Sequence, residues 1–235
     1  MLSIIVPCYN ESEGVNQLRE RLMPVIKNLE KTQQVQLIFV DDGSTDNTNE
    51  LLHKTFSEKF VKIIKHEKNM NLGAAVRTGF LAADGDVIVT MDSDCTYAPE
   101  EIPKLLDELK DCDIVTASPL CPGGKIIGVP AYRRFLSWGA TTLYSVITQK
   151  RIYTWAALFR AYRRDAISDI VIENNNFTAV VEILVKAIKN GKRVKEMPAE
   201  LTVRKYGMSK IKLASTILAH IKFLTQTARI MYFSK

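Results

Sequence analysis

Histidine and cysteine are scarce in this chain of 235 residues, which has three histidines and four cysteines. Cys8, Cys95, Cys112 and Cys121 show no C-x-x-C spacing and no neighbouring histidine cluster, so the pattern indicates neither a zinc site nor a disulfide framework. The simplest interpretation is a set of reduced thiols in a cytosolic compartment.

Long hydrophobic runs are also missing, because no window reaches the roughly 18 uncharged apolar residues that a membrane-spanning helix requires. The run from Phe135 to Gln149 stops short, and Lys222 and Arg229 interrupt the C-terminal one. The first apolar run, LSIIVPCYN, is short and has no basic leader, so we expect no secretory signal. The expected location is the cytoplasm, either free or peripheral on the cytoplasmic face of a membrane.

Two ligand classes lack their motifs. No G-x-G-x-x-G follows the first predicted strand, where the chain reads PCYNES, which argues against a nicotinamide-binding Rossmann domain. The net charge of +6 suits nucleic acid, a membrane surface or phosphorylated substrates, but no nucleic-acid motif is present and we expect no such partner. The acidic clusters lie in residues 1–118, whereas the basic runs follow Lys125 and are YRR, RAYRR, KNGKRVK and VRKYGMSKIK.

Near-continuous apolar strands alternate with helices along the first part of the chain. The predicted strands are LSIIVPCYNE, VQLIFVDD, FVKIIK and DVIVTMDSD, and helices are predicted from about Ser12 to Lys31 and over LGAAVRTGFLAAD. This alternation predicts an α/β fold with a Rossmann-like, mostly parallel sheet covered by helices on both faces. No low-complexity linker divides it, so we expect one domain over residues 1–210 and an amphipathic helix over 211–235.

Carboxylates stand where three predicted strands end. The carboxyl ends of parallel strands meet at one edge of a sheet, so these side chains are expected to share a crevice. Asp92 and Asp94 are one residue apart and project to the same side of an extended chain. Their repulsion is relieved by a proton, by water, or by a divalent cation that also binds an anion. The residues brought to this edge are Tyr9, Glu11, Asp41, Asp42, Asp92 and Asp94.

Each of these pieces also has a plainer interpretation. Asp-Gly-Ser after a strand is typical of a turn with a helix cap, and the aspartate pair ahead of Pro-Glu-Glu is typical of capping alone. Their convergence favours a metal-bound anion, since solvation alone explains an acidic crevice in a basic protein poorly.

The motifs SIIVPCYNE, VDDGSTDNT, KNMNLGAAVRTGF and DVIVTMDSD resemble, in order and spacing, those of the family 2 glycosyltransferases, which have the GT-A fold and use nucleotide sugars. In the second half, GVPAYRRFLSWGATTLY, FRAYRRDAI, VVEILVKA and VRKYGMSKIK resemble the dolichol- and polyprenol-phosphate mannosyltransferases. The resemblance implies a nucleotide-sugar-binding half at 1–118 and an acceptor half at 119–210.

The resemblance also implies a site for a GDP- or UDP-hexose, with mannose or glucose as the sugar. In it, Asp92 and Asp94 hold Mg²⁺ or Mn²⁺ on the diphosphate, where a hard cation stabilises the charge on the leaving group. Asp41 reads the base, although either Asp41 or Asp42 can face the pocket. Glu182 faces the donor sugar or anchors a loop, with a surface helix acid as the alternative. The implied nucleotide-sugar residues are Pro7, Tyr9, Glu11, Asp41, Asp42, Asp92, Ser93, Glu182 and Lys210.

For the acceptor, the resemblance implies that Arg133, Ser137 and Arg204, with Ser209 and Lys210, bind a polyprenyl phosphate and close over the donor. With Asp94, the first three are the expected catalytic residues. The implied reaction is direct displacement with inversion, which needs no histidine base because the acceptor is already an anion. Without the resemblance, Arg133 is a solvated helix charge and RKYGMSK an ordinary basic loop.

The chain departs from those synthases at three places. Cys95 and Thr96 replace the Leu-Gln that follows the two aspartates, Pro119 replaces an arginine expected near the phosphates, and YTWAALFRAYRRD lacks an Asp-x-Thr-x-Gly lead-in. Two other functions therefore stay open. One is a soluble transferase that acts on a saccharide or protein, and the other is a nucleotide-sugar-binding protein without turnover.

Apolar residues recur at helical spacing from Ile211 to Phe233, with basic residues between them. This helix either packs on the domain or lies in the headgroup layer of an anionic membrane. A helix from about Tyr132 to Thr148, with Trp138 and Tyr144, is expected to flank it. A membrane surface is the expected partner, and the sequence is also compatible with a membrane-protein partner or a homo-oligomer.

Overall fold

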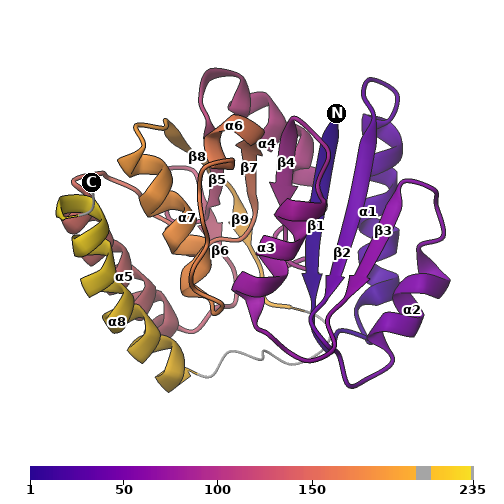
Figure 1. Ribbon diagram of the computed structural model, residues 1–235, viewed down its shortest axis with the longest axis horizontal. Helices are drawn as coiled ribbons and strands as arrows, with labels where there is room; N and C mark the ends of the chain where they lie inside the picture. Colours follow the sequence, from indigo (N-terminus) through magenta and orange to yellow (C-terminus); the bar gives the residue numbers. More distant parts are fainter. Residues whose placement is uncertain (205–212, 234–235) are drawn as a thin grey trace.

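Residues 1–204 and 213–233 are described by the structure, a computed structural model (Figure 1). Its main sheet has seven strands in the order β3-β2-β1-β4-β7-β5-β8, and β6 and β9 form a second, two-stranded sheet. The strands are β1 (Leu2–Cys8), β2 (Val35–Asp41), β3 (Val61–Lys65), β4 (Val87–Thr90), β5 (Ile114–Ser118), β6 (Lys125–Ile126), β7 (Arg160–Arg163), β8 (Val194–Pro198) and β9 (Glu200–Leu201).

The helices alternate with these strands. They are α1 (Val15–Leu29), α2 (Thr48–Thr55), α3 (Leu72–Ala82), α4 (Ile102–Glu108), α5 (Ala131–Thr148), α6 (Arg164–Ile167), α7 (Thr178–Lys189) and α8 (Leu213–Tyr232), with 3-10 turns η1 (Pro99–Glu101) and η2 (Leu109–Asp111). The strands and helices predicted in the first half are confirmed, with small differences at their ends.

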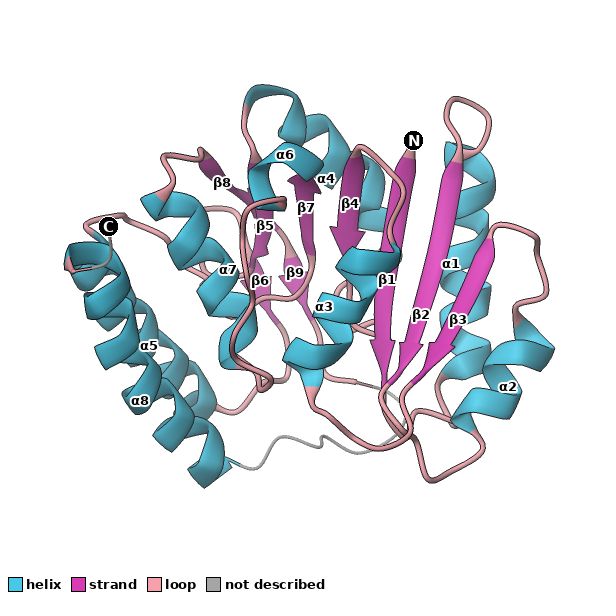
Figure 2. Cartoon of the chain, in the orientation of Figure 1, coloured by secondary structure: helices cyan, strands magenta, loops and turns pink. Residues whose placement is uncertain are grey.

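The sheet is mostly parallel, as predicted. β1 pairs in parallel with β2 and β4, and β2 with β3, so these strands point to the same edge (Figure 2). β7 runs the other way, because it pairs antiparallel with both β4 and β5. A strand from the second half of the chain therefore joins the two parts of the sheet.

Helices cover both faces of the sheet because side chains alternate along each strand. Leu2 and Ile4 of β1 belong to the core under α1, α2 and α4, whereas Ile5 belongs to the core under α3 and α7. The two apolar layers explain why the inner strands read as near-continuous hydrophobic runs.

Helix α8 lies beside α5 and α7 (Figure 1). Phe223 and Thr227 of α8 are fully buried, so one face packs on the domain as the first alternative required. Leu218 and Ile221 lie on α8 with their side chains exposed. The helix thus keeps an apolar outer surface as well as a packed inner one.

Acidification is expected to loosen this packing through His220. His220 Nδ1 lies 2.9 Å from the Tyr144 hydroxyl of α5, and burial lowers the pKa of His220 below its ordinary value of 6.5. Below pH 6.5 His220 therefore binds a proton more readily in the unfolded chain than in the folded one. As the pH decreases, the free energy of unfolding decreases by at most about 1.4 kcal/mol per pH unit.

Thermal unfolding between pH 7.5 and 5.5 tests this expectation. His220→Gln should flatten the pH dependence, whereas replacement of the exposed His53 by glutamine should not. The same slope in parent and His220→Gln would contradict it.

Over the described residues, none of the helices has both the length and the apolar character required to cross a membrane.

Candidate functional site

The ends of β1, β2 and β4 meet at one edge of the sheet. Cys8 of β1 stands beside Asp41 of β2, and Ile5 of β1 stands beside Thr90 of β4, so the residues that follow these strands emerge together. The segment after β1 and the Asp92–Asp94 segment after β4 are therefore neighbours, as the strand pattern predicted.

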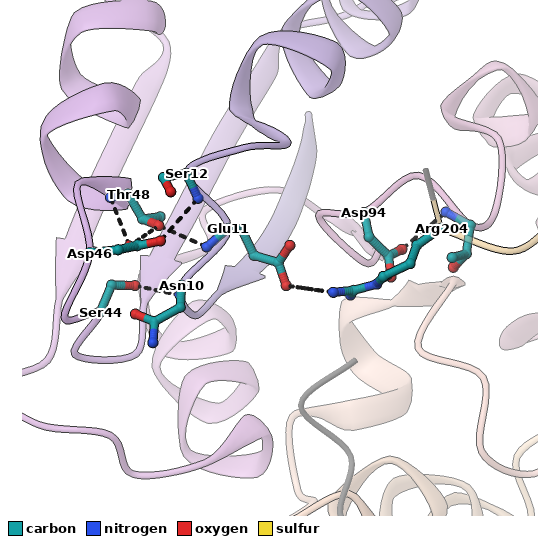
Figure 3. A network of polar contacts seen from close by, with 9 residues as sticks. Asn10, Glu11, Ser12, Ser44, Asp46, Thr48, Asp94 and Arg204 are labelled. Carbon is teal, nitrogen blue, oxygen red and sulfur yellow. Dashed lines mark hydrogen bonds and ion pairs between the residues drawn. The ribbon is translucent and has the colours of Figure 1, made fainter. Parts of the chain in front are cut away.

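The segment after β1 is held firmly by the turn before α2 (Figure 3). The backbone N–H groups of residues 10–12 donate in turn to Ser44 Oγ at 2.9 Å, Thr48 Oγ1 at 2.8 Å and Asp46 Oδ2 at 3.3 Å. Two sequence motifs thus meet in one hydrogen-bonded unit. It aims the Glu11 carboxylate across the strand ends toward Asp94.

Arg204 bridges those two carboxylates (Figure 3). Its Nη2 lies 2.6 Å from Asp94 Oδ2 and 3.4 Å from Glu11 Oε1, and its Nε donates to Asp94 Oδ2 at 3.1 Å. The side chains are largely shielded from solvent, with exposed fractions of 19% for Arg204, 12% for Asp94 and 11% for Glu11. The bridge places a cation between the ends of β1 and β4.

A backbone contact brings Arg204 there. The N–H of Thr202, just after β9, donates to the Thr96 carbonyl at 3.0 Å, while the Thr96 N–H donates to Asp94 Oδ1 at 3.0 Å. Thr96 therefore connects the segment that carries Arg204 to the acidic pair. The sequence did not predict this long-range contact.

Asp92 shows that negative charge is crowded here. Burial, and after it the nearby Asp94 carboxylate, raise the pKa of Asp92 to about 7. A divalent cation would relieve this crowding, and carboxylate oxygens are the ligands that Mg²⁺ and Mn²⁺ prefer. The oxygen ligands of the acidic pair therefore fit the predicted metal.

The protein supplies only part of the coordination. Among the described residues, no three His, Cys, Asp or Glu side chains gather closely enough to hold a metal ion by themselves. A cation bound through Asp92 and Asp94 would therefore take its other ligands from water or from a bound phosphate, as Mg²⁺ commonly does.

Asp41 and Asp42 point to different partners. Asp41 is fully buried, its Oδ1 accepts from the Ser44 N–H at 2.9 Å, and its buried Oδ2 has no hydrogen-bond partner among the described residues. Asp42 Oδ1 accepts from the Met70 N–H at 2.9 Å and contacts His66 Nδ1 at 2.7 Å. Asp42 is thus hydrogen-bonded within the protein, while one carboxylate oxygen of Asp41 remains available to accept a hydrogen bond from a ligand.

His66 is a site-supporting residue that the sequence did not indicate. Its Nε2 lies 2.9 Å from the Thr78 hydroxyl of α3, and its backbone N–H donates to the Asp41 carbonyl at 2.8 Å. It therefore links the ends of β2 and β3 to α3. A single histidine without a motif around it carried no signal.

Glu182 anchors a loop. It is fully buried in α7 and accepts from the backbone N–H groups of Glu173 at 3.0 Å and Asn174 at 2.9 Å, and Lys186 pairs with it at 2.7 Å. Burial raises the pKa of Glu182, but Lys186 and these amides outweigh it and hold the pKa below its ordinary value. The surface-acid alternative is wrong, and none of these contacts reaches the acidic pair.

The other predicted residues are spread around this edge. Pro7 lies buried in β1, Tyr9 is half-buried after it, and Ser93 is buried between the two aspartates. Ser137 is exposed on α5, which also carries Arg133, whose side chain lies outside the described part of the structure. Ser209 and Lys210 lie outside the described residues.

The chain matches the family described as Glycosyl transferase family 2 over residues 3–171. The dolichol-phosphate mannosyltransferase of Pyrococcus furiosus is 33% identical over 226 residues, which are 95% of this chain and 62% of that relative. The polyprenol monophosphomannose synthase of Mycolicibacterium smegmatis is 32% identical over 217 residues, or 88% and 80% of the two chains. The chain thus spans 62% of the length of the Pyrococcus relative.

Among solved structures, the chain resembles glucosyl-3-phosphoglycerate synthase from Mycobacterium tuberculosis in complex with Mn²⁺ and UDP-glucose. The TM-score is 0.74 at 15% sequence identity, with 100% of this chain and 80% of the other covered. At this identity the likeness concerns the fold alone, and it confirms the predicted GT-A architecture.

Proposed function

Because the chain belongs to glycosyl transferase family 2, we propose that it moves a hexose from a GDP- or UDP-sugar to a polyprenyl phosphate, with inversion, at a membrane surface. The names of the relatives support the lipid phosphate as acceptor, and mannose is the sugar that two of them name. The observation that carries the proposal is the acidic pair after β4, in which Asp94 is joined to Glu11 through the Arg204 guanidinium.

That geometry supports the following donor half of the site. Asp92 and Asp94 are the residues that would hold Mg²⁺ or Mn²⁺, which when bound stabilises the negative charge on the departing diphosphate. Asp41 Oδ2, which is buried and has no partner within residues 1–204 and 213–233, is the acceptor offered to an N–H of the base. An unpaired buried acceptor costs about 1–3 kcal/mol, so a donor N–H that reaches it gains binding free energy.

The acceptor half needs positive charge rather than a base. A phosphate monoester is already an anion and attacks without losing a proton, so its positioning and the neutralisation of its charge are the main requirements. Arg204 and Arg133 are the proposed contacts of the acceptor phosphate, since a guanidinium can bind phosphate through two parallel hydrogen bonds.

Exposed apolar side chains support the membrane surface. Phe135 and Trp138 of α5 and Leu218 and Ile221 of α8 are exposed, and a groove of about 540 Å³ runs along α5, with Lys150 and Arg151 in its lining. Aromatic and aliphatic groups beside cations suit a surface of anionic lipid.

A transfer assay with radiolabelled GDP-mannose or UDP-glucose tests the proposal. With undecaprenyl phosphate or dolichyl phosphate present, label should enter an organic-extractable product only when Mn²⁺ or Mg²⁺ is added. Transfer solely to water-soluble saccharides or proteins would instead favour the soluble-acceptor alternative.

Asp41→Asn is expected to weaken binding of the nucleotide diphosphate by about 10- to 100-fold, because the amide that replaces the charged acceptor forms a weaker hydrogen bond or none. Asp42→Asn should instead lower the melting temperature, since it weakens the contacts to His66 and Met70. Calorimetry and thermal unfolding of both variants measure the two effects. Weak nucleotide binding in Asp42→Asn together with normal binding in Asp41→Asn would reverse the assignment.

A further inference from the structure

The side chain of Arg21 connects helix α1 to the segment that carries the acidic pair. Its Nε and Nη2 donate to Glu100 Oε1 and Oε2 of η1 at 3.1 and 2.6 Å, and its Nη1 donates to the Cys95 carbonyl at 3.3 Å. All three bonds come from one planar guanidinium, so the two-point pair with Glu100 also fixes the direction of the third. Arg21 therefore holds the backbone directly after Asp94.

The Cys95–Thr96 peptide unit passes this contact on to Asp94. Its carbonyl accepts from Arg21, and its N–H, which belongs to Thr96, donates to Asp94 Oδ1 at 3.0 Å. A peptide unit is planar, so a contact that fixes its carbonyl also fixes the direction of its N–H. Arg21 thus acts on the orientation of the Asp94 carboxylate through the backbone, while its own hydrogen bonds go to Glu100 and Cys95.

The backbone conformation of Cys95 depends on support from its neighbours. Its φ is +54°, in the left-handed region, which a residue with a Cβ adopts only at a cost in free energy. The turn at Cys95 lets the Thr96 N–H point back to the side chain of Asp94, two residues earlier. Such conformations persist where surrounding contacts hold them. The hydrogen bond from Arg21 is a contact of this kind, because it holds the carbonyl of the left-handed residue itself.

We propose that Arg21 is a positioning residue of the metal site, which holds the Cys95–Thr96 peptide so that Asp94 keeps Oδ1 on the backbone and presents Oδ2 to the cation. Asp94 Oδ2 is the oxygen that lies 2.6 Å from Arg204. This inference rests on the proposed function, because it takes Asp94 as a ligand of Mg²⁺ or Mn²⁺. Side chains that orient a metal ligand from outside the coordination shell commonly change metal affinity by about 10- to 100-fold.

Two simpler roles of Arg21 predict different results. A surface ion pair, with exposed side-chain fractions of 30% for Arg21 and 52% for Glu100, would affect stability and leave metal binding unchanged. A positive charge near the acidic pair would repel a cation, so its removal would tighten metal binding. Positioning of Asp94 predicts the opposite sign, which is weaker metal binding by a folded protein.

Mn²⁺ titration in the presence of UDP or GDP, followed by the EPR signal of free Mn²⁺, tests the proposal without any transfer reaction. Arg21→Met should bind Mn²⁺ about 10-fold more weakly than the parent, since the peptide that orients Asp94 loses its anchor. Arg21→Lys can still donate to the Cys95 carbonyl but lacks the planar fork, so its Mn²⁺ affinity should fall between the two.

Arg19→Met is the matched control. Arg19 lies two residues earlier on α1 and makes the same kind of two-point pair, with Nη2 to Glu58 Oε1 at 2.7 Å and Nη1 to Oε2 at 3.2 Å. Its replacement removes the same charge from the same helix but leaves the Cys95 carbonyl bonded to Arg21. Mn²⁺ affinity in Arg19→Met should stay within about twofold of the parent, as expected for a screened charge. Arg21→Met should lose no more thermal stability than Arg19→Met.

Mn²⁺ affinity in Arg21→Met that equals or exceeds the affinity in Arg19→Met would overturn the inference. A much lower melting temperature in Arg21→Met than in Arg19→Met would also overturn it, because Arg21 would then act on the fold as a whole. Failure of the proposed function has a different signature, in which Mn²⁺ does not strengthen nucleotide binding even in the parent, and the inference falls with it.

Discussion

Replacement of Asp94 by alanine is expected to lower the rate of sugar transfer by about 10²- to 10³-fold, the usual cost of losing one group that stabilises transition-state charge. Asp94 lies after β4. Its Oδ1 accepts a hydrogen bond from the Thr96 N–H, and its Oδ2 accepts one from the Arg204 guanidinium. Without Asp94, we expect Asp92 alone to be too weak a ligand to hold a divalent cation on a diphosphate. Calorimetry of the nucleotide diphosphate should show that Mn²⁺ no longer strengthens binding.

Asp107→Ala supplies the control for Asp94→Ala. Asp107 is an exposed carboxylate that pairs with Lys110 at 2.8 Å, so its loss changes the net charge equally without removing a carboxylate of the acidic pair. Both variants should unfold near the parent's melting temperature. The same Mn²⁺-dependent nucleotide affinity in Asp94→Ala and in the parent would remove Asp94 from the metal site.

Arg160→Met is expected to destabilise the fold by about 3–5 kcal/mol, which is a large part of the roughly 5–15 kcal/mol that holds a typical domain together. Arg160 of β7 has an exposed fraction of 0% and donates to the Thr116 hydroxyl and to the carbonyls of Trp155 and Val180. Methionine fills similar space but leaves those carbonyls without this donor in the core. Chemical denaturation measures the loss.

Arg19→Met shows what a partly solvated pair contributes. Arg19 pairs with Glu58 at 2.7 Å, with exposed side-chain fractions of 36% and 23%, and its guanidinium lies 5.5 Å from the centre of the Phe56 ring. Removal of this pair and ring contact is expected to cost about 1–2 kcal/mol. If Arg160→Met were no more destabilising than Arg19→Met, the hydrogen bonds of the buried guanidinium would make no special contribution to the stability of the fold.

The first half of the fold could be predicted because its signals are local. β1 and β2 are runs of buried residues and β4 is nearly so, and polar residues follow at each strand end, so the pattern also located the acidic edge. The separation of roles between Asp41 and Asp42 followed from the alternation of side chains. Which of the two carries the unpartnered oxygen needed the contacts of His66 and Met70, which come from the end of β3 and the loop after it.

The second half of the fold was harder to predict because its structure depends on contacts between residues that are far apart in the sequence. β7 carries Arg160 in the middle of an apolar run, and a buried arginine has no local pattern that separates it from a surface one. Arg204 reaches Asp94 beside the place where Thr202 donates to the carbonyl of Thr96, a residue 106 positions earlier in the chain. A sequence motif records neither event.

The position of β7 between β4 and β5 has a consequence for how the protein can be divided. A fragment that ends at Ser118 would contain the acidic edge, but β4 and β5 would each lack the strand that pairs with them, leaving open edges that tend to aggregate. The remainder of the chain would carry β7 without either neighbour. Two separately expressed pieces should therefore be poorly soluble alone. They should become ordered only when they reassociate and β7 pairs again with β4 and β5.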